Sequence, residues 1–391
     1  MRVSIPFGAV VALALAMLAT TAQAQVPADI AEGLKKIGQI VDPACTAKLY
    51  RPLMPKNDFN TYWPRDASAP VFTGELYPGI TVARDQSFGP NPKDVVDIFT
   101  AEKGGANRPV FIYVAGGAGN KIEQQVREGN AFYDNIGRWA TKNGMVGVLI
   151  QRHPGSGNWD DGGRDISLAV DWIKANIGKY SGNPNRMFIA AHSAGTGPLG
   201  VYVGHPTKWP NGVQVKGAIY MSGNPVPGAG GVGAAGGRGA PGAGGSAPAP
   251  GSACGLPPTS MTSSEGAIAG PSGVREAAAP GGRGGRGAFQ PLTPEQLAER
   301  DNLPGFKATP VKIMLVRAEL DPGVMGDMTA ADKALHDAMC KLDGEKAKDG
   351  VGHCPAMLFA KSHSHMSEVF AFDTPDTTVS APILAWMKGI K

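Results

Sequence analysis

The 391-residue sequence has little excess charge of either sign. It contains 37 Lys and Arg residues against 33 Asp and Glu residues, for a net charge of +4. Nucleic-acid-binding proteins usually concentrate basic residues on one element, so we expect no nucleic-acid partner. After residue 25 no apolar run approaches the roughly 18–20 residues of a membrane helix, which argues against stable membrane insertion. Hydrophobic residues make up 42% of the chain, enough for a packed core.

Residues 1–24 have the pattern of a secretory signal peptide. Arg2 is followed by an apolar stretch from Val10 to Leu18 and by the small-x-small sequence Ala22-Gln23-Ala24. The residue directly after the expected cleavage point is Gln25 and not a cysteine, which argues against a lipoprotein. We therefore expect an exported protein, periplasmic or secreted, in a compartment that tolerates disulfides.

The four cysteines are Cys45, Cys254, Cys340 and Cys354. They allow three full pairings, among which proximity favours Cys340–Cys354. The alternative for the C-terminal pair is a metal site. That site would combine Cys340, His353, Cys354, His363 and His365. Their spacing matches no common metal-binding framework, so we expect neither a metal nor an organic cofactor.

A segment of unusual composition interrupts the chain at residues 226–290. It holds 20 of the 55 glycines and a single aromatic residue, Phe289. Such a segment cannot bury enough apolar surface to offset its ordering entropy, which predicts a flexible Gly/Ala/Pro-rich insertion. Its Arg-Gly tract lacks the interleaved aromatics of a single-strand-binding segment. Without leader and insertion about 300 residues remain, and we divide them into an N-terminal extension, 25–84, and one domain, 85–391.

That domain alternates short apolar runs with segments of helical periodicity. The predicted strands are Val95–Thr100, Pro109–Val114, Met145–Ile150, Met187–Ala190, Gly217–Met221, Val311–Val316 and Ala356–Ala360. Predicted helices lie between them, one beginning at Thr293-Pro294 and the last spanning Thr378–Met387. Near-continuous apolar strands separated by amphipathic helices are typical of a parallel sheet covered on both faces. The predicted fold class is α/β, doubly wound.

Ligands of such sheets bind beyond the carboxyl ends of the strands, so the residues after each strand are the candidate site. Ser193 follows the predicted strand Met187–Ala190 and lies between the small residues Ala191 and Gly195. A nucleophile on a tight strand-to-helix turn requires small neighbours. The alternative is a serine that merely caps a helix.

A serine nucleophile needs a base and an acid that orients the base. Asp321 follows the strand Val311–Val316, and the proline after it suits an acid at a strand end; Glu319 is the alternative. His363 and His365 follow the last strand, and either provides a base in the chain order Ser, Asp, His.

The glycine-rich turn after Pro109–Val114 completes the predicted site. Backbone N–H groups of Gly117, Ala118 and Ala194 would bind the oxyanion that forms on an attacked carbonyl. A phosphate loop would end in Gly-Lys-Ser or Gly-Lys-Thr, and this turn does not.

The segment Asn176–Arg186 and the sequence His192-Ser193-Ala194-Gly195 resemble the nucleophile region of α/β-hydrolases of the carboxylesterase and lipase superfamily. The resemblance covers about residues 85–223 and 305–391. It implies Ser193 as nucleophile, Asp321 as acid and Gly116 to Ala118 in the oxyanion loop. It also favours His365 over His363, because His365-Met366-Ser367 matches the family's base. Ala115 stands where that family's loop carries a leading His, and the insertion occupies the position of a lid.

These features predict an exported serine hydrolase that cleaves small carboxylic esters through an acyl-enzyme. The alternatives are a non-catalytic binding protein of the same fold, or a peptidase or lipase that uses the same triad. The sequence leaves the natural ester and the oligomeric state open.

Overall fold

A computed structural model describes residues 25–53, 77–116, 133–151, 158–226, 292–324, 326–345 and 352–391. The strands are β1 Ile80–Ser87, β2 Val95–Ala101, β3 Arg108–Val114, β4 Val146–Ile150, β5 Gly182–His192, β6 Gly217–Met221, β7 Lys312–Leu320 and β8 Ala356–Ser364. The α-helices are α1 Ala28–Ile37, α2 Pro43–Tyr50, α4 Asp134–Lys142, α5 Asp161–Asn176, α6 Thr196–Gly204, α7 Pro294–Glu299, α8 Leu303–Ala308, α9 Ala330–Glu345, α10 Ser367–Phe370 and α11 Ser380–Gly389.

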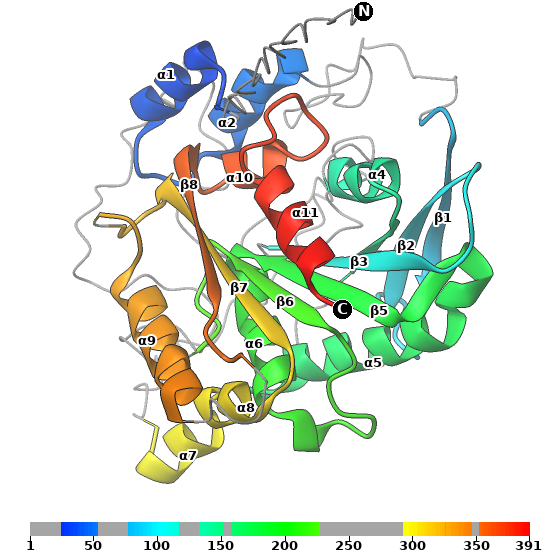
Figure 1. Ribbon diagram of the computed structural model, residues 1–391, viewed down its shortest axis with the longest axis vertical. Helices are drawn as coiled ribbons and strands as arrows, with labels where there is room; N and C mark the ends of the chain where they lie inside the picture. The colour runs from blue at the N-terminus through cyan, green and yellow to red at the C-terminus, as the bar shows by residue number, and fades with distance from the viewer. Residues whose placement is uncertain are drawn as a thin grey trace, which may run out of the picture.

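The strands form one eight-stranded sheet in the order β1-β2-β4-β3-β5-β6-β7-β8 (Figure 1). β2 runs antiparallel to both of its neighbours, and every pair from β4 to β8 is parallel. The carboxyl ends of β5, β6, β7 and β8 therefore lie along one edge of the sheet. The predicted doubly wound α/β class is confirmed, and the mostly parallel sheet with helices on both faces is an α/β-hydrolase fold.

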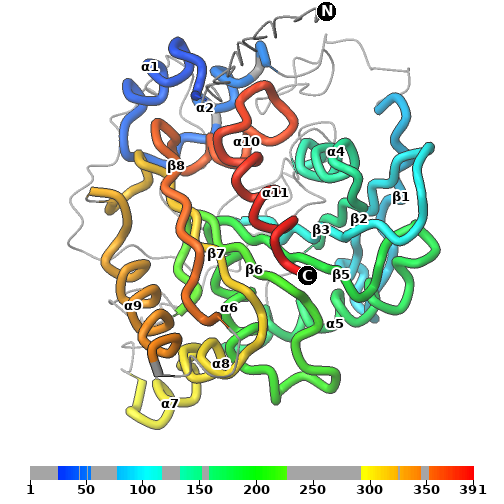
Figure 2. The backbone as a smooth tube through the Cα atoms, in the orientation of Figure 1, coloured from blue at the N-terminus to red at the C-terminus, as the bar shows by residue number. Residues whose placement is uncertain are grey.

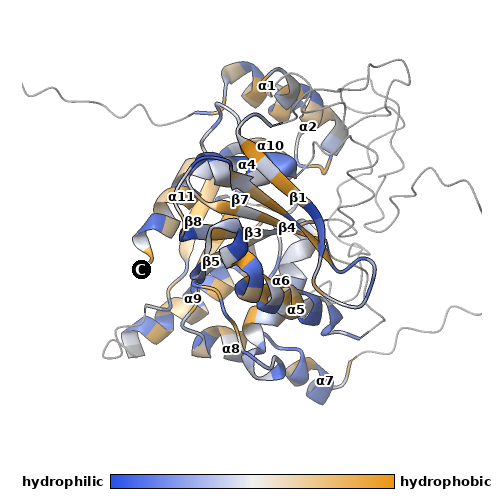
Figure 3. Cartoon of the chain, turned by 90° about the vertical axis from the view of Figure 1, so that its right-hand side faces the viewer, coloured by the Kyte–Doolittle hydropathy of each residue, from blue (hydrophilic) through white to orange (hydrophobic). Residues whose placement is uncertain are grey.

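Each face of the sheet is covered by its own layer of helices. Along β3, Phe111 and Tyr113 enter the core beneath α4, α10 and α11, whereas Val110 and Ile112 enter the core beneath α5, α6, α8 and α9. Side chains alternate between the two faces of a strand, and both faces are buried here, so the strand is apolar from Val110 to Val114. In Figure 3 the inner part of the sheet accordingly carries hydrophobic colour between helices of mixed colour.

The N-terminal helices α1 and α2 pack beside the C-terminal part of the chain (Figure 2). The Tyr50 hydroxyl donates a hydrogen bond to Asp376 at 2.8 Å, and its ring stacks on Phe370 of α10. Both contacts are buried and join positions more than 300 residues apart in the sequence. The N-terminal extension is thereby part of the same packed body as the sheet.

The seven predicted strands correspond to β2 through β8, with ends that differ by several residues in β5, β7 and β8. The helix predicted to begin at Thr293-Pro294 is α7, where Thr293 forms a capping box with Gln296. The sequence did not predict β1, and the proposed boundary between residues 84 and 85 falls inside that strand. Apart from Val226, the predicted insertion lies outside the described residues. Among the helices of the described ranges, none has the length and apolar character that crossing a bilayer would require.

Candidate active site

Ser193 lies where β5 ends and the chain turns sharply into α6. His192 has extended backbone angles, and a single 3₁₀ turn, Ser193–Gly195, precedes Thr196. Ser193 itself has a φ of +52°, in the left-handed region that non-glycine residues seldom occupy. A residue held in this conformation at a strand-to-helix turn presents its side chain at the edge of the sheet. The turn is the strained elbow that the sequence predicted for a nucleophile.

Two glycines allow neighbouring backbone to approach this elbow. A Cβ on Gly195 would lie 2.7 Å from the carbonyl oxygen of Ala115, and one on Gly116 would lie 2.9 Å from that of His192. Both separations are shorter than real Cβ contacts, so neither position accepts a larger residue without displacement of the main chain. The predicted need for a small residue at position 195 therefore has a physical cause.

The structure brings Ser193, His365 and Asp321 together in one hydrogen-bonded row. His365 lies directly after β8, and its Nδ1 is 2.5 Å from Oδ1 of Asp321, after β7. Its Nε2 is 2.8 Å from Oγ of Ser193. An ionised carboxylate only accepts hydrogen bonds, so Nδ1 carries the proton and Nε2 of the neutral ring accepts from the serine hydroxyl. This tautomer is the one that a general base for Ser193 requires.

Arg317 of β7 holds the carboxylate of Asp321 from its other side. Its Nη1 lies 2.5 Å from Oδ2 of Asp321, while Nε and Nη2 donate to Asp332 of α9 at 2.8 and 2.9 Å. Burial opposes the charge of Asp321, but His365 and Arg317 outweigh it and hold the pKa of this carboxyl below its ordinary value. Asp321 is thus an anion at neutral pH, fixed between two cationic or potentially cationic groups.

The two alternative residues have other partners. Glu319 accepts a hydrogen bond from the backbone N–H of Ser362 at 2.6 Å. The ring nitrogens of His363, which lies within β8, are 2.9 Å from Ser367 Oγ and 2.6 Å from Thr378 Oγ1. Burial lowers the pKa of His363 to about 4, so it stays neutral in the core. The geometry favours Asp321 and His365, and their catalytic roles stay predictions.

Behind His365 lies a buried polar pair that the sequence analysis missed. Nε2 of His192 donates to the backbone carbonyl of His365 at 2.8 Å and lies 3.5 Å from Oε1 of Glu368, on α10. Burial and the neighbouring His365 lower the pKa of His192 to about 3. Burial and the charge of Asp321 raise the pKa of Glu368 well above its ordinary value. Both side chains are therefore uncharged at neutral pH, and His192 anchors the main chain of the base.

Of the three predicted oxyanion residues, the structure describes one. Ala194 is exposed in the 3₁₀ turn directly after Ser193. Gly117 and Ala118 lie outside the described residues. The described end of their loop, Ala115 and Gly116, packs against the elbow.

The predicted disulfide Cys340–Cys354 is confirmed. Cys45 is disulfide-bonded as well, to a partner outside the described residues. The alternative metal cluster is not assembled as predicted, because His363 and His365 are engaged in the hydrogen bonds described above and both sulfur atoms are bonded to each other.

Comparison with known proteins agrees with this architecture. Residues 95–229, from β2 past the elbow and β6, match the model of the carboxylesterase family. The matched stretch is about a third of the chain and includes the elbow with Ser193. No curated protein matches the sequence at a significant level.

Many solved structures are similar to the chain. A tributyrin-phosphonate-inhibited esterase B from Lactobacillus rhamnosis is 10% identical, with a TM-score of 0.33 over 39% of this chain and 51% of that one. The chain thus spans about half the length of that structure. A truncated carbohydrate esterase from gut microbiota is 12% identical, with a TM-score of 0.47 over 79% and 96%. Carboxyl esterase 2 from the mycorrhizal fungus Tuber melanosporum is 11% identical, with a TM-score of 0.48 over 82% and 89%.

Proposed function

We propose that the chain is a serine esterase in which Ser193, His365 and Asp321 carry out the hydrolysis of small carboxylic esters. The observation that carries the proposal is the continuous row from Ser193 Oγ through both ring nitrogens of His365 to Asp321, with separations of 2.8 and 2.5 Å. Those distances allow proton transfer between the hydroxyl and the ring. The match of residues 95–229 to the carboxylesterase family supports the ester as substrate class.

In this mechanism Ser193 Oγ attacks the ester carbonyl while Nε2 of His365 takes the hydroxyl proton. Asp321 holds the ring in the required tautomer and stabilises the imidazolium. When the tetrahedral intermediate collapses, the imidazolium gives its proton to the leaving alkoxide. Water then attacks the acyl-enzyme while His365 accepts a proton from that water. When the second tetrahedral intermediate collapses, the imidazolium returns this proton to Ser193 Oγ and the carboxylic acid is released.

The oxyanion of each tetrahedral intermediate would be bound by the N–H groups of Ala194, Gly117 and Ala118. Removal of one such donor typically costs about 3–4 kcal/mol of transition-state stabilisation. The exposed position of Ala194 next to Ser193 is compatible with this role.

The first test is hydrolysis of a short-chain p-nitrophenyl ester by the purified protein and by Ser193→Ala. We expect turnover by the wild type and loss of nearly all of it in the variant, with an unchanged circular dichroism spectrum. His363→Gln is the matched control for His365→Gln, because both histidines lie near the end of β8 and only one contacts Ser193. Full activity of Ser193→Ala would show that another residue is the nucleophile. An inactive wild type that a fluorophosphonate does not label at Ser193 would favour the non-catalytic binding protein.

We also propose that the protein is exported. The signal-like pattern of residues 1–24 is one support, and the disulfide Cys340–Cys354 is another, since disulfides persist mainly in oxidising compartments. Fractionation of expressing cells should find a chain that begins at Gln25 in the periplasm or medium. A full-length chain in the cytoplasm would contradict the proposal.

A further inference from the structure

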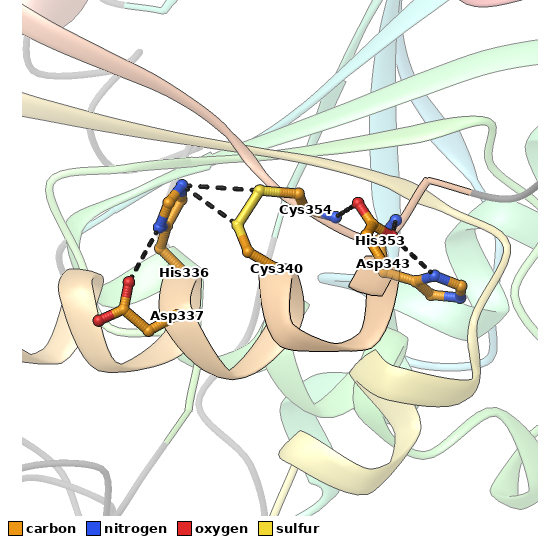
Figure 4. The surroundings of a disulfide bond; sticks show 6 residues. All are labelled: His336, Asp337, Cys340, Asp343, His353 and Cys354. Carbon is orange, nitrogen blue, oxygen red and sulfur yellow. Dashed lines mark hydrogen bonds and ion pairs between the residues drawn. A yellow bond between two sulfur atoms is a disulfide. The ribbon is translucent and has the colours of Figure 1, made fainter. Parts of the chain in front are cut away.

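The disulfide Cys340–Cys354 has an imidazole directly beside it. His336 lies four residues before Cys340 on α9, so the two side chains share one face of the helix. Its Nε2 is 3.3 Å from Sγ of Cys340 and 3.7 Å from Sγ of Cys354 (Figure 4). The three potential ligand atoms all lie within 4.8 Å of one another. None of the three residues belongs to the site proposed for ester hydrolysis.

The orientation of the imidazole is fixed from its other side. Nδ1 of His336 lies 3.3 Å from Oδ1 of Asp337. A carboxylate accepts, so the tautomer that bonds Asp337 carries its proton on Nδ1, and the Nε2 lone pair of that tautomer faces the two sulfurs. Metal-binding histidines in proteins typically have this carboxylate on the nitrogen that does not bind the metal.

The position of Cys354 does not depend on the disulfide alone. Asp343, near the end of α9, accepts hydrogen bonds from the backbone N–H groups of His353 at 2.5 Å and Cys354 at 2.9 Å (Figure 4). These bonds tie the segment before β8 to the helix that carries Cys340 and His336. The two cysteines therefore stay neighbours when the bond between them is reduced.

We propose that reduction of Cys340–Cys354 creates a site for a zinc-class divalent cation, with Cys340, Cys354 and His336 as its ligands. Around tetrahedral zinc, with Zn–S about 2.3 Å and Zn–N about 2.0 Å, sulfur and nitrogen ligands lie about 3.5 Å apart and two sulfurs about 3.8 Å apart. Nε2 of His336 lies 3.3 and 3.7 Å from the two sulfurs, close to this nitrogen–sulfur distance. Reduction brings the two sulfurs to the sulfur–sulfur distance of such a site, because non-bonded sulfur atoms separate to about that length.

The chemistry balances as two steps. A dithiol reductant passes two electrons and two protons to the disulfide, which gives two cysteine thiols and the oxidised reductant. The cation then replaces the two thiol protons, which go to solvent, and binds two thiolates and the neutral imidazole. Water completes the four ligands, as in sites that keep one position open. The disulfide thus prevents metal binding until it is reduced, because it holds both sulfur ligands in a bond to each other.

The test is a titration with Co²⁺, whose bonds to sulfur give a charge-transfer absorption. We expect the oxidised full-length protein to show no such band. After reduction by a non-coordinating phosphine it should bind one Co²⁺ with the band, and Zn²⁺ should displace it. His336→Gln should weaken binding more than tenfold, and Asp337→Asn about tenfold, the lower end of the usual effect of such a partner. His353→Gln is the matched control and should bind like the wild type, because the His353 ring contacts Asp343 rather than the sulfurs.

Reduction also opens the disulfide of Cys45, so two further variants keep the test specific. Cys340→Ser should abolish the band in the reduced protein. Cys354→His should bind Co²⁺ without any reductant, since it replaces one sulfur ligand by nitrogen and leaves Cys45 paired; circular dichroism checks its fold. Equal affinity of His336→Gln and the wild type, a band that persists in Cys340→Ser, or no binding by folded Cys354→His would each overturn the proposal.

Discussion

Arg317 is the residue whose loss should cost the most stability near the proposed triad. Its guanidinium bonds Asp321, Asp332 and the carbonyl of Gly223, and all three charged side chains are at most 7% exposed. Arg317→Met keeps the bulk of the side chain but leaves two buried carboxylates without their cation. Removing one partner of a buried ion pair costs about 3–5 kcal/mol, because the remaining charge is desolvated without compensation. We expect a loss of that size, toward its upper end because two carboxylates are affected.

Urea denaturation at pH 7, with a shift of the midpoint at constant slope, measures this loss. Lys333→Met is the matched control on α9: its ion pair with Asp327 is more than half exposed, and its removal should cost no more than about 1 kcal/mol. Turnover should fall as well, since Asp321 loses the contact that fixes its second oxygen. A free energy of unfolding for Arg317→Met within about 1 kcal/mol of the wild type would refute the reasoning.

Three further outcomes are expected. Gly116→Ala places a Cβ 2.9 Å from the carbonyl oxygen of His192, so kcat should fall about 10- to 100-fold through displacement of the elbow, and unchanged kcat would contradict this. The pKa of His363 is about 4 in the folded chain, so the unfolded chain takes up the proton first and stability should fall from about pH 6.5 to pH 4. In urea titrations over that range His363→Gln should lose less stability on acidification than the wild type, and an equal loss would count against the assignment. Deletion within residues 228–288 should leave the thermal midpoint nearly unchanged; a large drop would show that the segment is packed.

The sequence predicted the sheet well wherever a strand is buried on both faces. Such strands are apolar without interruption, as in Val146–Ile150 and Gly217–Met221, and the pattern is visible in any window. The sequence did not predict β1, because it is an edge strand of mixed exposure that contains Arg84 and Asp85. The structure gives Arg84 partners that no local pattern shows, Asp97 and the buried Asp134.

The three proposed triad residues were predictable because each follows its own strand, and parallel strands end at one edge of the sheet. Their supporting residues were not. Arg317 and Asp332 pair across β7 and α9, and His192 and Glu368 meet across β5 and α10, so no spacing along the chain connects them. His336 is different, because a histidine four residues before a cysteine on a predicted helix can be recognised from the sequence alone.

The charges around His365 follow a simple balance. His192 and Glu368, which lie behind it, are both kept neutral by burial, so neither contributes a charge. The remaining groups are one cation, Arg317, and two carboxylates, Asp321 and Asp332. The three groups together have a net charge of one negative unit. In the proposed mechanism an imidazolium forms at His365 when Ser193 is deprotonated, and that single positive charge cancels the excess. The imidazolium of the transition state would therefore form beside a compensating negative charge, and an ionised Glu368 or His192 would change that balance in opposite directions.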